Sequence, residues 1–180
     1  MNYRTDKYGN ELSILGFGCM RFPTIDDDSA NIDEAATAEM IDYAIKNGIN
    51  YFDTAWGYHS GMSETVCGEL LSEYPRESFY LASKFPGYDL SNFGKHEEIF
   101  NKQLEKCKTD YFDFYLYHNV CELNIDKYLD DSTGLTEFLL KMKEEGKIRH
   151  LGFSCHGSQE TMHRFIMKNF RHIEFCQIQL

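Results

Sequence analysis

The sequence has no long apolar run and few positive charges. The longest uninterrupted apolar runs are about four residues, such as those at 79–82 and 114–117, whereas a helix that spans a bilayer needs about 20. The chain of 180 residues carries 18 Lys and Arg against 29 Asp and Glu, which gives a net charge of −11 at pH 7. A chain this acidic binds polyanions poorly. We therefore expect no membrane span, no nucleic-acid partner and no anionic membrane partner.

Closely spaced cysteines and a secretory leader are also missing. None of the six cysteines forms a C-x-x-C pair, and the first residues contain no apolar leader segment. This pattern is typical of reduced thiols in the cytoplasm rather than of a disulfide framework. Iron–sulfur clusters need tightly spaced thiolates. We expect a cytoplasmic location and no iron–sulfur cluster within residues 1–180.

The sequence does contain an alternation of β-type runs with amphipathic helical runs. A hairpin is expected over 3–15 with its turn at Gly9 and Asn10, and the first helix is expected to have Ala36, Met40, Ile41, Ala44 and Ile45 on its inner face. Strand starts recur about every 25 to 35 residues, the size of a βα unit. Expected strands cover 15–20, 49–52, 79–83, 112–117, 148–153 and 175–180, and expected helices cover 33–47, 63–73, 95–108, 135–145 and 158–168.

This alternation predicts a parallel sheet covered by helices, in one domain over residues 1–180. Two architectures compete, a doubly wound open sheet and a (β/α) barrel. No G-x-G-x-x-G or G-x-x-x-x-G-K-[ST] motif follows the first expected strand, which weakens the open nucleotide-binding sheet. The histidines show no H-x-H or H-E-x-x-H pattern, which argues against a metal-dependent barrel hydrolase.

Reactive side chains fall at the ends of successive expected strands. Asp53 ends the second strand, Lys84 the third and His118 the fourth, while Tyr58 follows Asp53 by five residues. In a parallel barrel all carboxyl ends of the strands open onto one face, so these side chains are expected to converge there. Ser154 ends the fifth strand.

These residue types suit the reduction of a carbonyl group. The oxyanion must be protonated as hydride reaches carbon, and a free tyrosine, with a pKa near 10, is a weak acid for that task. A neighbouring ammonium such as Lys84 lowers the pKa of a phenol such as Tyr58. Asp53 would keep that lysine charged and oriented, and His118 would hydrogen-bond the substrate carbonyl.

Four motifs resemble those of the aldo-keto reductases: Asp53-Thr54-Ala55-Trp56-Gly57-Tyr58, Ala82-Ser83-Lys84, Tyr115-Leu116-Tyr117-His118 and Leu151-Gly152-Phe153-Ser154. The resemblance implies an eight-stranded (β/α) barrel of the TIM type that binds a nicotinamide cofactor, usually NADPH, and reduces an aldehyde or ketone. NADH stays open. It implies a catalytic tetrad of Asp53, Tyr58, Lys84 and His118. The cofactor residues that it implies are Gly18, Cys19, Met20, Asp53, Ser154, Cys155 and Gln177.

The sequence departs from the family pattern in two ways. Cys155 stands where the family usually has asparagine, and the run from Phe153 to His156 resembles a bacterial branch whose members often carry a C-terminal iron–sulfur segment. A (β/α) barrel typically needs about 250 residues. We therefore expect an incomplete barrel of about six of the eight strands, a fragment inactive by itself that belongs to an active parent. Its unpaired sheet edges would favour oligomers.

Other interpretations stay open at this point. One is a non-catalytic sensor or interaction protein that keeps the barrel and binds the nicotinamide cofactor. Another is a half-barrel scaffold that assembles with a second chain. Taken singly, Asp53 could cap a turn, Tyr58 could be a surface aromatic residue, and His118 could be a histidine at the edge of the core.

Overall fold

The computed structural model describes residues 1–179, and the chain divides into two compact units. The first unit comprises Met1–Ala82 and Lys106–Thr109, and the second comprises Ser83–Glu105 and the residues from Asp110 onward. The main sheet has the strand order β3-β4-β5-β6-β7-β8. Strand β5 (Tyr80–Phe85) begins in the first unit and ends in the second. The single domain predicted over residues 1–180 stays a prediction.

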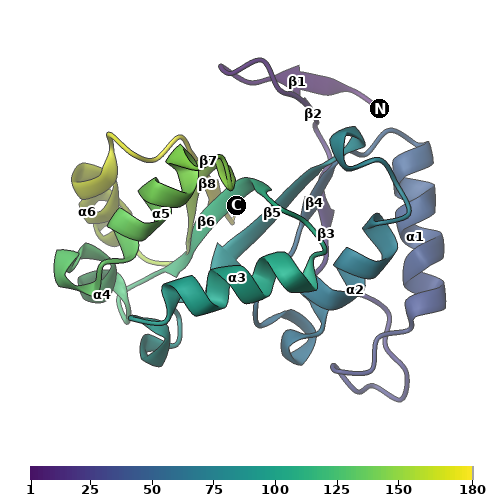
Figure 1. Cartoon of the computed structure of the whole chain (residues 1–180), viewed down its shortest axis with the longest axis horizontal. Helices are drawn as coiled ribbons and strands as arrows, with labels where there is room; N and C mark the ends of the chain where they lie inside the picture. Colours follow the sequence, from purple (N-terminus) through teal and green to yellow (C-terminus); the bar gives the residue numbers. More distant parts are fainter. Residues whose placement is uncertain (180) are drawn as a thin grey trace. The chain divides into compact units, whose positions relative to one another are not determined.

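The predicted hairpin opens the first unit (Figure 1). Strands β1 (Tyr3–Thr5) and β2 (Glu11–Ser13) pair antiparallel. The Tyr3 hydroxyl donates to the carbonyl of Gly48 at 2.9 Å, and the Asn50 side chain donates to the carbonyl of Glu11 at 2.8 Å. The hairpin is therefore fixed to the segment that leads into β4 (Tyr51–Asp53).

Helix α1 (Glu34–Lys46) follows the predicted bounds within one residue at each end. Asp33 caps it by accepting the Ala36 N–H at 3.0 Å, and Gly48 supplies the left-handed backbone that ends it, with a φ of +87°. Local capping chemistry fixes both ends, which explains why the sequence predicted them well.

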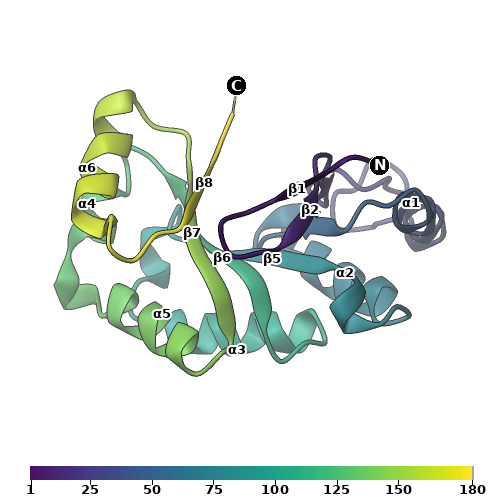
Figure 2. The same ribbon diagram turned by 90° about the horizontal axis from the view of Figure 1, so that it is seen from above.

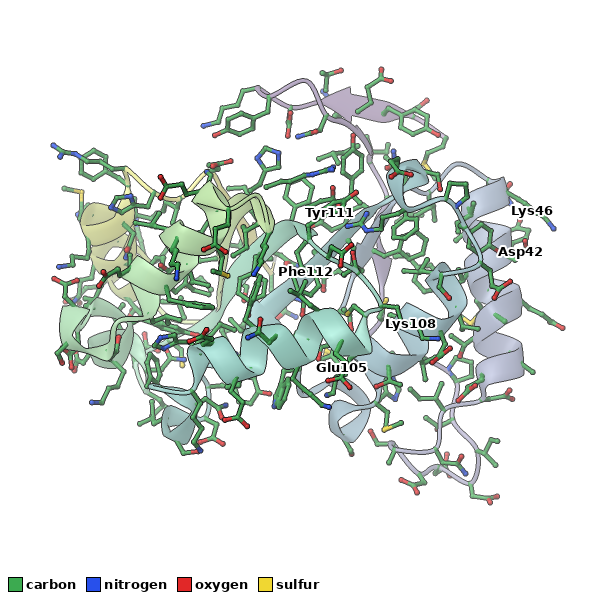
Figure 3. All side chains as sticks on the ribbon, in the orientation of Figure 1. Asp42, Lys46, Glu105, Lys108, Tyr111 and Phe112 are labelled. Atoms are coloured by element: carbon green, nitrogen blue, oxygen red, sulfur yellow. The ribbon has the colours of Figure 1, made fainter. Side chains whose placement is uncertain are left out.

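The buried face of α1 differs from the predicted one. Its buried residues are Thr37, Ile41 and Ala44, which recur at helical spacing. Met40 was expected inside, but it is 43% exposed. It lies about 100° around the helix from Ile41, at the margin of the buried stripe. On the outer surface of the same helix Asp42 and Lys46 form a solvent-exposed ion pair (Figure 3).

The sheet of the first unit is parallel. Strand β3 (Phe17–Gly18) pairs with β4, and β4 pairs with the start of β5. Helix α2 (Ser63–Leu71) lies beside α1 (Figure 1). Two short 3₁₀ turns, Tyr58–Gly61 and Arg76–Ser78, flank α2 along the chain.

The second unit continues the alternation of strands and helices. Strand β7 (Ile148–Cys155) pairs parallel with β6 (Phe112–Val120) and with β8 (Phe175–Ile178). Its long helices are α3 (His96–Lys106), α5 (Leu135–Glu144) and α6 (Gln159–Asn169). Helices α5 and α6 lie on the same side of β7 (Figure 2). Short turns at Leu90–Asn92 and Asp131–Thr133 complete the unit.

Aromatic side chains make much of the core between these helices and strands. Phe165 of α6 is fully buried, with its ring centroid 4.8 Å from Phe153 of β7 and 5.1 Å from Tyr117 of β6. Ser158 caps α6 by accepting the N–H of Thr161, as predicted. The sequence did not predict the short helix α4 (Ile125–Leu129), which packs against α6. The predicted end of the last strand, at 180, lies outside the described residues.

Among residues 1–179, none of the helices combines the length and the apolar character that crossing a bilayer would require.

Candidate active site

Asp53 is the last residue of β4 in the first unit. Its carbonyl accepts the Cys19 N–H at 2.8 Å, and its register partners are Gly18 on β3 and Ala82 on β5. The backbone ladder thus sets Asp53 at the carboxyl end of the strand, as predicted. The side chain is only 9% exposed.

The predicted first-strand cofactor residues, 18–20, lie beside this strand end. Gly18 is exposed, Cys19 is fully buried, and Met20 is 54% exposed. The Cys19 carbonyl accepts the Ser63 hydroxyl of α2 at 2.9 Å. Of the three, Gly18 and Met20 therefore offer surface to a ligand, and Cys19 anchors the turn between them.

Tyr58 lies in a turn rather than in a strand, and its side chain is half-buried. Directly after it the backbone is left-handed at three consecutive residues, with φ of +52° at His59, +54° at Ser60 and +92° at Gly61. For non-glycine residues this conformation needs support from the surroundings. His59 provides part of it, because Nε2 accepts the Phe22 N–H at 2.9 Å and Nδ1 donates to the Ser29 carbonyl at 3.0 Å.

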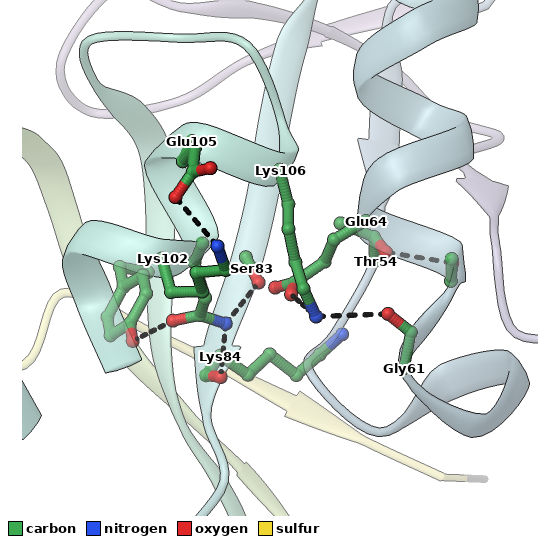
Figure 4. Close-up of polar contacts among 11 residues, drawn as sticks. Thr54, Gly61, Glu64, Ser83, Lys84, Lys102, Glu105 and Lys106 are labelled. Carbon is green, nitrogen blue, oxygen red and sulfur yellow. Dashed lines mark hydrogen bonds and ion pairs between the residues drawn. The ribbon is translucent and has the colours of Figure 1, made fainter. Parts of the chain in front are cut away.

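Lys84 lies on β5, and its neighbours in the second unit fix its direction. Gln103 of α3 donates to the Ser83 hydroxyl at 2.9 Å and accepts the Tyr115 hydroxyl of β6 at 2.6 Å (Figure 4). Ser83 and Tyr115 therefore face α3. Because side chains alternate along a strand, Lys84 points to the opposite face, here called the site face. Its side chain is only 1% exposed.

His118 reaches the site face by the same reasoning. Its neighbour Tyr117 donates to Thr136 of α5 at 3.1 Å, so Tyr117 faces the helices and His118 faces away from them. Burial, together with the nearby charges of Lys84 and His156, lowers the pKa of His118 to about 3. The imidazole is therefore neutral at pH 7.

Tyr128 of α4 fixes the strand ends that carry these two side chains. Its hydroxyl donates to the His118 carbonyl at 2.8 Å and lies 3.4 Å from the Phe85 carbonyl. The ring also passes so close to Gly87 that a Cβ there would lie 2.1 Å from the hydroxyl oxygen. Burial raises the pKa of Tyr128 well above its usual range, so it stays a neutral donor.

Ser154 and Gln177 are register partners on β7 and β8, so they share one face. Phe153 packs on Phe165 of α6, which puts Ser154 and Gln177 on the site face. The Ser154 hydroxyl accepts the Asn119 N–H at 2.8 Å. Cys155 alternates to the other face, where its thiol lies 4.0 Å from the Gly157 carbonyl, and burial raises its pKa.

The second unit thus presents a row of four polar side chains from four successive strands, Lys84, His118, Ser154 and Gln177, on one face. A nicotinamide carboxamide offers one carbonyl acceptor and two N–H donors. The Ser154 hydroxyl and the Gln177 amide complement both, so the residues present fit such a group. No cluster of three or more His, Cys, Asp or Glu side chains suited to a metal ion occurs within residues 1–179.

Three residues that support these positions were not predicted from the sequence: Gln103, Tyr128 and Lys106. Gln103 and Tyr128 are buried and bonded as described, and Lys106 contacts the turn that carries Tyr58. A polar residue on a helix does not reveal its partner in the sequence, and no local motif marks these three.

Comparison with known proteins identifies the family. The model of the Aldo/keto reductase family matches residues 14–180. "Probable aldo-keto reductase 1" of Glycine max is 32% identical over 164 residues, which cover 87% of this chain and 45% of that protein. L-galactose dehydrogenase of Arabidopsis thaliana is 29% identical over 152 residues, 81% of this chain and 46% of its own length. The chain therefore spans about half the length of these curated relatives.

Solved structures agree with the sequence matches. An aldo-keto reductase from Bacillus halodurans in its holo form superposes with a TM-score of 0.77 at 26% identity, over all of this chain and 58% of that one. An aldo-keto reductase from Klebsiella pneumoniae in complex with NADPH shares the fold at 21% identity, with a TM-score of 0.77 over 99% of this chain and 58% of its own. These matches confirm the predicted fold class, parallel βα units of an aldo-keto reductase barrel after an N-terminal hairpin, with six strands present. The chain belongs to the aldo-keto reductase family.

Proposed function

We propose that the whole protein containing these residues transfers a hydride between a nicotinamide cofactor and a small aldehyde or ketone, with Tyr58 as the proton donor. One observation carries the proposal: Lys84 and His118 lie on one face at neighbouring strand ends, and the charge of Lys84 helps to keep His118 neutral. Family membership supports the cofactor and the reaction class.

Each side chain has a distinct task in this proposal. The Lys84 ammonium would stabilise the negative charge that develops on the Tyr58 oxygen as its proton leaves. The Asp53 carboxylate keeps that ammonium charged and directed. The proton then passes from the Tyr58 hydroxyl to the carbonyl oxygen of the substrate.

His118 orients the substrate instead of protonating it. A neutral imidazole with a pKa of about 3 is a hydrogen-bond partner at pH 7 and a poor source of protons. Ser154 and Gln177 would hold the nicotinamide carboxamide by the complementary donors and acceptors described above. When bound, the cofactor supplies the hydride. NADPH is the favoured form because it is bound in an aldo-keto reductase of the same fold; NADH and the roles of Gly18, Cys19, Met20 and Cys155 stay predictions.

Replacing Tyr58 with phenylalanine tests the proposal. The ring keeps its packing and loses only its hydroxyl, so kcat for aldehyde reduction should fall by about 10²-fold or more, the usual contribution of a general acid. The Kd for NADPH should change by less than about twofold, because the variant removes a group that acts in the transition state. NADPH oxidation with a panel of aliphatic and aromatic aldehydes measures the first quantity, and cofactor fluorescence measures the second.

Tyr43→Phe is the matched control. Tyr43 lies on α1 and is 72% exposed, so the loss of its hydroxyl should leave both quantities unchanged. A Tyr58→Phe protein that reduces aldehydes as fast as wild type would exclude Tyr58 as the donor. Cofactor binding without any carbonyl reduction in wild type would favour the non-catalytic sensor.

A further inference from the structure

The turn that carries Tyr58 has an unusual backbone, and this raises the question of what holds it. Its three left-handed residues, His59 to Gly61, include two that are not glycine. Such residues are strained and persist only where the surroundings impose them. His59 fixes the turn on one side through its two hydrogen bonds to the segment 22–29.

Lys106, the last residue of α3, holds the other side. Its Nζ donates to the Gly61 carbonyl at 3.0 Å and lies 4.2 Å from the centroid of the Trp56 ring. Trp56 and Gly61 stand on either side of Tyr58 in the sequence. One ammonium therefore contacts the turn before and after the proposed proton donor, by a hydrogen bond and by a cation–π contact.

Glu64 of α2 gives the ammonium its counter-charge. Its side chain is fully buried, and its Oε2 lies 3.7 Å from Lys106 Nζ (Figure 4). The Lys106 side chain is itself only 18% exposed. A buried carboxylate strongly favours a nearby cation, because removing one partner of such a pair leaves an uncompensated charge. The pair therefore directs the Lys106 ammonium at the turn.

The backbone of Lys106 also packs closely against α2. A Cβ on Gly68 of α2 would lie 2.1 Å from the Lys106 carbonyl oxygen and 2.8 Å from the backbone of Cys107. The absence of a side chain at Gly68 thus lets residues 106 and 107 lie directly on α2, and this contact sets where Lys106 Nζ ends.

We propose that Lys106, paired with Glu64, is a positioning residue that holds the Tyr58 turn in its left-handed conformation. The consequence for proton transfer rests on the proposed function; the consequence for the conformation of the turn does not. Loss of the ammonium should misplace the phenol and lower kcat by about tenfold, since small misplacements of a reacting group are costly. The KM for the carbonyl substrate should change much less.

The chain supplies its own probe, because Trp56 is its only tryptophan. In the Lys106→Met variant the indole loses its cation, so we expect a changed emission maximum and a Stern–Volmer constant for acrylamide that rises about twofold. Hydrogen exchange in peptides that cover 56–62 should become faster. Lys102→Met is the control, because Lys102 lies on the same helix, is 51% exposed and pairs with Glu105 instead.

Two further variants keep the test decisive if Lys106→Met does not fold. Glu64→Gln keeps the shape of the side chain and removes the charge, so it should shift Trp56 emission and exchange in the same direction. Lys106→Arg keeps the cation and should restore slow exchange in 56–62. The double variant Lys106→Met/Glu64→Gln should show less than the sum of the single effects, since the two residues act as a pair.

The outcomes separate this proposal from the proposed function. Faster exchange and altered emission in a protein that reduces no carbonyl compound would support the held turn and overturn the proposed function. An active protein in which Lys106→Met and Glu64→Gln match Lys102→Met in emission, exchange and kcat would overturn the role of Lys106. Equal losses in kcat with unchanged emission and exchange would overturn it too.

Discussion

The turn that carries Tyr58 and the strand ends that carry Lys84 and His118 achieve precise placement by different means. Tyr58 follows its strand by several residues, in a strained turn that is bonded to other segments through Lys106 and through its own His59. Lys84 and His118 lie within strands, so the backbone ladder and the alternation of side chains place them. Placement in the first region therefore depends on a few side-chain contacts, and placement in the second depends on the backbone ladder.

Among these predictions, the greatest loss of activity is expected from a substitution of Lys84 in the second region. Lys84→Met removes the ammonium that, in the proposed mechanism, stabilises the charge developing on the Tyr58 oxygen, so kcat for carbonyl reduction should fall by about 10²-fold or more at pH 7. It also removes one of the causes that lower the pKa of His118, which should rise in an NMR titration. Lys141→Met, at a lysine that is 67% exposed, should change neither quantity. Retention of wild-type kcat would refute the role of Lys84.

The next effect tests the anchor of the first region. Gly68→Ala places a methyl group 2.1 Å from the Lys106 carbonyl oxygen, so the free energy of unfolding should drop by about 1 to 3 kcal/mol, as for other overpacked sites. Urea titration followed by circular dichroism measures it. Gly18→Ala is the stability control, because a Cβ there meets nothing within 4 Å. An equal stability of the two variants would contradict the tight contact at Gly68.

The free energy of unfolding should depend on pH through His118, in the second region. Between about pH 6.5 and pH 3 the unfolded imidazole binds a proton that the folded one, with its pKa near 3, does not bind. The unfolded state therefore binds more protons in this window, and the free energy of unfolding should decrease as the pH falls through it. His118→Gln should flatten that slope when urea midpoints are compared across the window. An unchanged slope would show that other groups govern acid stability.

The smallest expected effect concerns the hydroxyl that fixes the strand ends. Tyr128→Phe leaves the His118 carbonyl without its 2.8 Å hydrogen bond and should cost about 1 kcal/mol of unfolding free energy. Because the ladder still holds the strands, kcat should fall less than in Lys106→Met. Tyr43→Phe provides the exposed control in the same urea titration. A larger loss of kcat in Tyr128→Phe than in Lys106→Met would invert the comparison between the two regions.

The sequence predicted those parts of the fold that depend on local chemistry. Asp33 and Ser158 cap their helices through their own side chains, so α1 and α6 were placed within a residue or so. The parallel sheet followed from the alternation of strands and helices. Helix α4 was missed because it is a single turn or so of five residues, which tertiary packing stabilises.

The candidate site likewise contains residues that the sequence predicted and residues that it did not. The sequence predicted Asp53, Lys84, His118 and Ser154 at strand ends. The structure has Asp53 as the last residue of its strand and the other three among the last three residues of theirs, while their roles stay predictions. Gln103, Lys106 and Tyr128 were not found. Their hydrogen-bond partners are distant in the sequence. When the partners are unknown, the sequence does not distinguish a buried glutamine from a solvated one.

The alternation along β5 makes the proposed chemistry sensitive to strand register. A slip of one residue would exchange Ser83 and Lys84 between the two faces of the strand. The ammonium would then be pressed against the amide of Gln103, and a hydroxyl would take its place beside the imidazole. Strands β4 and β5 pair in register from Tyr51 and Tyr80 to Asp53 and Ala82, and this pairing opposes such a slip. A chain with this slipped register would keep its helices and most of its hydrogen bonds, but it would have no ammonium beside the phenol. A measurement of secondary structure alone would therefore not distinguish an active molecule from a mispaired one.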